Sequence, residues 1–198
     1  MKKIFLSGVA FAFTLTFLAC QSADKKSSMT KDSVAGDTTM VNGVHVSGSE
    51  STASGLDEAG ATFLKKAAVG GMMEIEAAKI AQTNAKNALV KDFAKTMLQD
   101  HSKANTELKA LAIEKKIIIP AGVPADEEIH LNEMKKMKGD AFDKHYMDMM
   151  VADHDKTVVL FKEGMLNRNS ELKEWAKNTL AVIEQHAVKA KEIASKLK

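Results

Sequence analysis

The chain contains little of several residue types that define other protein classes. It has a single cysteine, Cys20, in 198 residues, so it can form neither an internal disulfide nor a cysteine cluster that holds a metal. Aromatic residues make up only 5% of the chain, which argues against an all-β fold. Its 28 basic and 26 acidic side chains nearly balance, and Arg168 is the only arginine, so the composition also argues against a dedicated nucleic-acid binder.

A long apolar run lies at the N-terminus. Residues 4–18 are almost entirely apolar and follow the charged pair Lys2-Lys3. A charged start followed by an apolar stretch of this length is typical of a secretory signal, whereas a membrane-spanning helix needs about 20 apolar residues. Residues 17–20, Phe-Leu-Ala-Cys, resemble the lipobox of bacterial lipoproteins. Residues 1–19 are therefore predicted to be a lipoprotein signal peptide.

Lipidation would explain the single cysteine. Cys20 is predicted to carry the lipid and to become the first residue of the mature chain; the alternative is an ordinary cleaved signal with an incidental cysteine. Acyl chains on Cys20 would make the membrane a partner of this protein and place it in the cell envelope, at the outer membrane facing the periplasm or the surface. Residues 20–56 are rich in Ser, Thr, Gly and Asp and are predicted to form a flexible tether. No protein partner can be named from the sequence.

Helical periodicity begins near residue 57 and continues to the C-terminus. It predicts long helices from residue 57, over 88–115, from residue 140 and from residue 170, with a short helix over 126–137. The connections between the long helices are short, then roughly 25 residues, then short, which is the order of ferritin-like bundles. The predicted fold over 57–198 is thus all-α: a ferritin-like four-helix bundle with one long crossover between helices 2 and 3.

Two local features add detail to this prediction. Gly70 and Gly71 are poor helix formers, so their place inside the first helix indicates that a neighbouring helix comes close there. Asp140 and Asp143 are three residues apart at the expected start of the third long helix, which predicts an interaction like a capping box.

The same region resembles the DUF4142 family of bacterial exported or outer-membrane proteins with ferritin-like domains. The residues that carry the resemblance are Phe63, the segment Gly70-Gly71-Met72-Met73-Glu74-Ile75-Glu76, Asp100-His101, Leu108, Ala141-Phe142-Asp143, Tyr146, His154, Leu180 and His186. The match spans about residues 57–198. The resemblance implies a ferritin-like fold and an envelope location, and it implies no particular reaction.

One residue of a metal-ligand type lies on the predicted inner face of each long helix. These residues are Glu74, His101, His154 and His186. Three imidazoles and one carboxylate suit a first-row transition-metal ion such as Zn, Cu, Mn or Fe. Asp100 and Asp153 each precede one of the histidines and are predicted to orient the ligands. The most specific hypothesis is therefore one transition-metal site in the bundle core.

The same residues allow a second interpretation. Glu74 and the histidines can form a metal-free polar network that fixes the register of the helices, or they can lie at different heights and not meet. The protein would then be a structural or stress-related envelope protein whose partner contacts lie on its outer surface. Both interpretations favour a non-enzymatic protein, because the chain has no phosphate loop, nucleophile elbow or available catalytic cysteine.

A repeated segment suggests a possible copper ligand set. The pattern M-x-x-D-H-x-K occurs at residues 97–103 and 150–156, with a methionine one helical turn before each histidine. Such a pair suits Cu(I), although methionine is also a common filler of irregular cores.

Di-iron proteins carry Glu-x-x-His on two helices of the bundle. The one such pair here, Glu127 and His130, lies in the crossover and is interpreted as part of a solvated face, so we expect neither iron storage nor oxygen activation.

Overall fold

The computed structural model describes residues 55–197, and every regular element in this range is an α-helix. The helices are α1 (Glu58–Asn84), α2 (Ala88–Glu114), α3 (Ala125–Lys136), α4 (Gly139–Gly164) and α5 (Ser170–Ala194). The predicted all-α fold is confirmed. The predicted signal peptide (1–19), Cys20 and the tether up to residue 54 lie outside the described residues. None of the five helices is long and apolar enough to cross a membrane.

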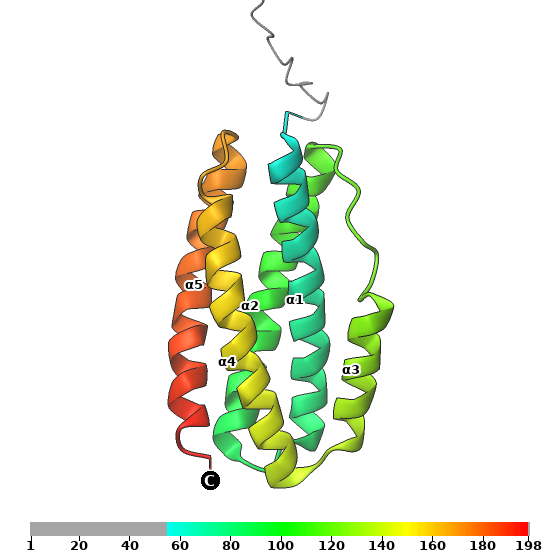
Figure 1. Cartoon of the computed structure of the whole chain (residues 1–198), viewed down its shortest axis with the longest axis vertical. Coiled ribbons are helices and arrows are strands. Elements are labelled where there is room, and N and C mark those ends of the chain that lie inside the picture. Colours follow the sequence, from blue (N-terminus) through cyan, green and yellow to red (C-terminus); the bar gives the residue numbers. More distant parts are fainter. Residues whose placement is uncertain (1–54, 198) are drawn as a thin grey trace, which may run out of the picture. The chain divides into compact units, whose positions relative to one another are not determined.

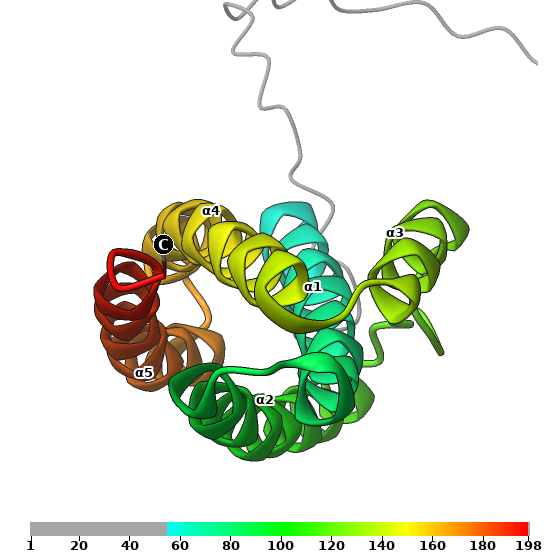
Figure 2. The ribbon, with the colours of Figure 1, turned by 90° about the horizontal axis from the view of Figure 1, so that it is seen from below.

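Four of the helices form a bundle and the fifth lies outside it (Figure 1). Seen along the bundle, α1 has α2 and α4 as neighbours, α5 completes the square, and α3 lies against the outer side of α1 (Figure 2). The second helix ends at one end of the bundle and α4 begins at the other, so the connection between them must run the length of the bundle (Figure 1). This connection contains α3 and is the predicted long crossover.

A buried carboxylate from α4 stabilises the turn between α1 and α2. Asp143 accepts hydrogen bonds from the main-chain N–H of Lys86 at 3.0 Å and of Asn87 at 2.8 Å. The predicted capping box is therefore wrong: α4 begins at Gly139, has no side-chain cap, and leaves Asp143 to satisfy donors of a different turn. The main-chain donors at the start of α2 also need acceptors, and the side chain of Asn87 supplies one to the N–H of Leu89.

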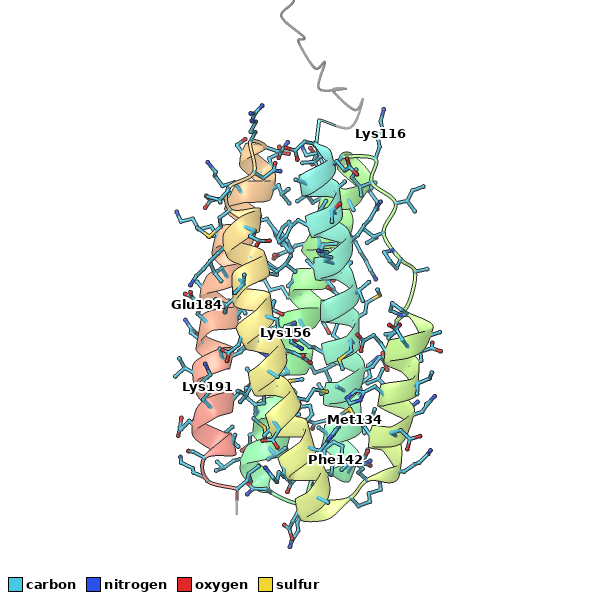
Figure 3. The ribbon with its side chains drawn as sticks, in the orientation of Figure 1. Lys116, Met134, Phe142, Lys156, Glu184 and Lys191 are labelled. Atoms are coloured by element: carbon cyan, nitrogen blue, oxygen red, sulfur yellow. The ribbon has the colours of Figure 1, made fainter. Side chains whose placement is uncertain are left out.

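The crossover helix is attached to the end of α1. The side-chain amide of Asn84 donates to the main-chain carbonyls of Met134, Lys135 and Met137 at 2.9 to 3.3 Å, which satisfies acceptors at the C-terminal end of α3. Met134 is fully buried. Figure 3 shows Met134 near Phe142, at the end of the bundle where α4 begins.

A polar layer divides the bundle core into two hydrophobic clusters. Along α2, Met97 belongs to one cluster and Leu108 to the other, with His101 between them. Along α5 the order is reversed, and His186 lies between Ile183 and Ala190. The antiparallel helices thus place their polar residues at one height, and the layer they form is the candidate site.

Candidate metal centre

Glu74 on α1, His101 on α2, His154 on α4 and His186 on α5 meet in the polar layer. Their exposed fractions are 4, 7, 0 and 5%, so water reaches them little. The centroids of the three imidazole rings are 5.4 to 5.8 Å apart. One ligand atom from each histidine lies within 4.8 Å of the other two. The structure therefore brings all four predicted residues together at one height of the bundle.

One nitrogen of each ring is held by an oxygen acceptor. Nδ1 of His101 lies 2.9 Å from Oε2 of Glu74, and Nδ1 of His154 lies 2.9 Å from the main-chain oxygen of Met150. Nε2 of His186 lies 2.9 Å from Oδ2 of Asp100. Carbonyl and carboxylate oxygens accept hydrogen bonds, so in each pair the ring nitrogen donates, and this fixes the tautomer of the neutral imidazole.

The other ring nitrogens are buried without hydrogen-bond partners among the described residues. They are Nε2 of His101, Nε2 of His154 and Nδ1 of His186. In a neutral imidazole whose first nitrogen donates, the second carries a lone pair and can only accept a hydrogen bond or bind a metal. A buried polar atom without a partner costs about 1–3 kcal/mol of stability, so three of them in one layer point to a ligand.

The charges in the layer depend on the balance between burial and attraction. Burial opposes ionisation of Glu74, but the nearby imidazoles, above all His101, outweigh it and lower the pKa of the carboxyl. Burial also opposes the charged form of His101, yet the charge and hydrogen bond of Glu74 raise its pKa. Burial lowers the pKa of His154, and it lowers the pKa of His186 despite the opposing hydrogen bond to Asp100. Two of the three rings are thus held in the neutral form that binds metals.

A groove between α2 and α5 leads from the surface to the layer. Its volume is about 290 Å³, and Asp100, His101, Thr179, Ile183 and His186 are among the residues that line it. Two of the three rings therefore border a path that an ion or a small external ligand can take.

The two aspartates that precede the histidines differ in their surroundings, although they hold equivalent positions in the repeated segment. Asp100 accepts the hydrogen bond of His186 and so holds a ring of the layer. Asp153 instead forms an ion pair with Lys156, with 3.3 Å between Oδ1 and Nζ. Met150, which the sequence suggested as a sulfur ligand, contributes its main-chain oxygen to His154.

Sequence reasoning missed a second group of ligand-type residues, on α3 and α4. His130 on α3 is half-buried, contrary to its interpretation as part of a solvated face, and its Nε2 lies 3.1 Å from Sδ of Met149 on α4. The rings of His130 and His145 have centroids 5.3 Å apart. His145 and Met149 are four residues apart and so share one face of α4, which was the signal in the sequence that could have found them.

Comparisons with known proteins agree with this fold. A family model described as "Domain of unknown function (DUF4142)" matches residues 46–193. The fold is similar to that of a DUF305 protein from Streptomyces coelicolor, at a TM-score of 0.60 and 13% identity, over 70% of this chain and 93% of the other. A DUF305 fragment from Deinococcus radiodurans is similar at a TM-score of 0.64 and 9% identity, over 72% and 99% of the two chains. No curated protein matches the sequence.

Proposed function

The chain belongs to the DUF4142 family, and we propose that its helical domain binds one divalent transition-metal ion through His101, His154 and His186. The observation that carries the proposal is the set of three buried ring nitrogens without hydrogen-bond partners. Each belongs to a ring whose other nitrogen is held by oxygen, the arrangement that orients histidine ligands in metalloproteins.

The spacing of the rings is compatible with an ion between them. Three nitrogens bound to one ion at about 2.1 Å lie about 3.4 to 3.6 Å from one another. One ligand atom from each ring is already within 4.8 Å of the others. Binding therefore needs only small movements that draw the rings together.

Glu74 has a different role in this proposal from the one expected of a fourth ligand. Its Oε2 is engaged by His101, and its Oε1 lies 3.5 Å from Nδ1 of His154. Both contacts are to the nitrogens that face away from the lone pairs. Glu74 therefore orients His101 through Oε2 and supplies negative charge near the ion, while Nδ1 of His154 is held by the main-chain oxygen of Met150. Asp100 orients His186 in the same way. The proposed ligands are therefore the three histidines, without Glu74.

The three imidazole ligands select among the candidate ions. Imidazole suits Zn²⁺ and Cu²⁺, whereas Mn²⁺ prefers oxygen ligands, and Fe²⁺ binds more weakly than Cu²⁺ to a given site. An ion held by three histidines keeps a further coordination position for water or an external ligand. The groove between α2 and α5 gives access to that position. We propose Zn²⁺ or Cu²⁺ as the ion and binding, rather than catalysis, as the role.

We further propose that the protein is an exported lipoprotein anchored in the cell envelope through Cys20. The support is the charged start, the apolar run and the lipobox-like residues 17–20. In a bacterial host the protein is expected in the membrane fraction, and the Cys20→Ser variant in the soluble fraction. Membrane association of the variant equal to that of the wild type would contradict the anchor.

Elemental analysis tests the metal site. The full chain is produced without a histidine tag, extracted in detergent and purified without chelator, and its metal content is measured by mass spectrometry. The wild type is expected to hold about one Zn or Cu per chain, as purified or after incubation with each ion, because three ligands are preoriented. A His101→Ala, His154→Ala double variant is expected to hold none in the core site.

Folding must be checked separately, since the variants remove buried side chains. Circular dichroism should show the helical content of the wild type, and a His101→Gln, His154→Gln variant of similar volume repeats the measurement. Absence of metal from the wild type after incubation with Zn, Cu, Mn and Fe ions would contradict the proposal. The layer would then be a metal-free polar network, and the search for function would move to the outer surface.

A further inference from the structure

The group on α3 and α4 has the donor atoms of a second metal site. We propose that His130, His145 and Met149 bind one Cu(I) ion at the junction of the crossover helix and the bundle. This inference does not depend on the central site, because none of its ligands belongs to the polar layer.

The first observation is a contact between a nitrogen and a sulfur. Nε2 of His130 lies 3.1 Å from Sδ of Met149. A thioether is a weak hydrogen-bond acceptor, so an imidazole gains little from pointing at one. The two atoms are, however, both ligands that suit Cu(I), because soft thioether and thiolate ligands select this ion and imidazole also binds copper.

The second observation is a buried nitrogen without a partner. Nε2 of His145 is buried and has no hydrogen-bond partner among the described residues. The ring of His145 lies beside that of His130, with centroids 5.3 Å apart and an angle of 43° between the ring planes. Two nitrogens and one sulfur are thus gathered from two helices, and one of them lacks any other interaction that would explain its burial.

The donor atoms, more than the surrounding charge, favour a soft ion. A thioether is a soft ligand that selects Cu(I) over hard divalent ions. Glu74, Glu127, Asp153 and Lys156 line the same cavity as His130 and Met149, so carboxylates are available there to balance the charge of a bound cation. This cavity, of about 490 Å³, lies among α1, α3 and α4 and gives an ion a route to His130 and Met149.

Competition for Cu(I) tests the site. The full chain carrying His101→Ala and His154→Ala, which removes the central site, is titrated with Cu(I) under anaerobic ascorbate against the chromogenic chelator bicinchoninate. One Cu(I) per chain is expected to remain bound. Adding Met149→Leu should lower the affinity at least about tenfold, because leucine keeps the packing and removes the sulfur. His145→Gln should have a comparable effect.

A matched methionine provides the control. Met72 on α1 is half-buried like Met149, so Met72→Leu removes one sulfur from elsewhere in the chain and should leave Cu(I) binding unchanged. X-ray absorption of wild-type protein loaded with Cu(I) should show a copper–sulfur distance that disappears in Met149→Leu. This second measurement needs no central substitution. Equal Cu(I) affinity of the Met149→Leu and Met72→Leu chains, or a copper spectrum without sulfur, would overturn the proposal.

Discussion

The two groups of histidines differ chiefly in the atoms that hold their rings. In the central layer each ring donates to an oxygen, supplied by Glu74, Asp100 or the main chain. In the group on α3 and α4, His130 contacts a sulfur and His145 keeps a buried nitrogen without a partner. The difference teaches that the neighbours of a histidine, more than the histidine itself, decide which ion a cluster suits. Oxygen partners and nearby charge suit a divalent ion, and a thioether suits a soft monovalent one.

Removing the oxygen acceptor of one ring in the central layer should have the largest effect on metal binding. Asp100→Ala leaves Nε2 of His186 without its acceptor, so the ring loses its fixed tautomer and orientation. We expect the affinity for Zn²⁺, measured by isothermal titration calorimetry on the full chain, to fall about 10–100-fold.

The repeated segment supplies the matched control for that substitution. Asp153 holds the equivalent position before His154 but pairs with Lys156 at the surface. Asp153→Ala is therefore expected to change the affinity for Zn²⁺ by less than about twofold, as surface ion pairs contribute little. Equal losses in the two variants would show that Asp100 does not act through His186.

Acidification tests the protonation states in the central layer. A proton competes with a metal for each imidazole, so the affinity for Zn²⁺ should fall at least about tenfold between pH 7.5 and 5.5. His101 should protonate first, because Glu74 raises its pKa, while His154 and His186 should resist. Affinity that stays constant across this range would contradict coordination by these rings.

The same pKa shifts predict the stability of the metal-free protein. His154 and His186 titrate at lower pH in the folded state, so the unfolded chain takes up their protons first as the pH falls below about 6.5, and stability is lost. His101 has the opposite sign: its contribution is full below about pH 6.5 and is lost as the pH rises through its raised pKa. The free energy of unfolding should therefore be greatest at about pH 6.5, fall above it through His101 and fall below it through His154 and His186, as measured by urea unfolding at a series of pH values.

A variant of His154 separates the contributions of the individual histidines to the pH dependence of stability. His154→Gln removes one of the two rings that lose stability in acid, so the free energy of unfolding should depend less on pH than in the wild type. A steeper dependence in this variant would show that His154 is not held neutral in the folded protein.

The sequence predicted the bundle and the inward position of its polar residues because both depend on periodicity. The spacing of apolar residues fixes which face of a helix is buried, and connection lengths fix the topology. Glu74 and the histidines were predicted to lie on those buried faces, but periodicity does not fix their heights along the bundle, and only the structure shows that they meet. The partners of the rings could not be predicted in this way. Asp100 and Asp153 have the same local sequence, and only the rotation of α2 against α5 places one of them beside His186.

The contacts of Asp143 and His130 also could not be predicted from the sequence. Asp143 follows the spacing of a capping box, yet its carboxylate is used by the turn after α1, which is more than 50 residues away in the chain. His130 looked solvated because the face of α3 that packs on the bundle depends on the path of the crossover. Both cases depend on contacts between distant segments, which periodicity within one helix does not contain.

The smallest expected effect concerns the spacing between α1 and α2 beside the central layer. A Cβ atom at Gly71 would lie 2.3 Å from Oδ1 of Asn105, which is buried on α2 one turn after His101. Gly71→Ala should therefore push the helices apart, lower the free energy of unfolding by about 1–3 kcal/mol and weaken Zn²⁺ binding a few-fold. Binding of Cu(I) at α3 and α4 should be unchanged, since those ligands do not depend on this spacing.

The adjacent glycine separates close packing from helix propensity. A Cβ atom at Gly70 would meet nothing within 4 Å. Gly70→Ala should raise the free energy of unfolding by about 0.5–1 kcal/mol, because alanine favours the helix, and leave Zn²⁺ binding unchanged. The predicted close approach thus belongs to Gly71 alone. If both variants stabilised the protein equally, α2 would have room to move away from α1, and the contact between Glu74 and His101 would not depend on the glycine.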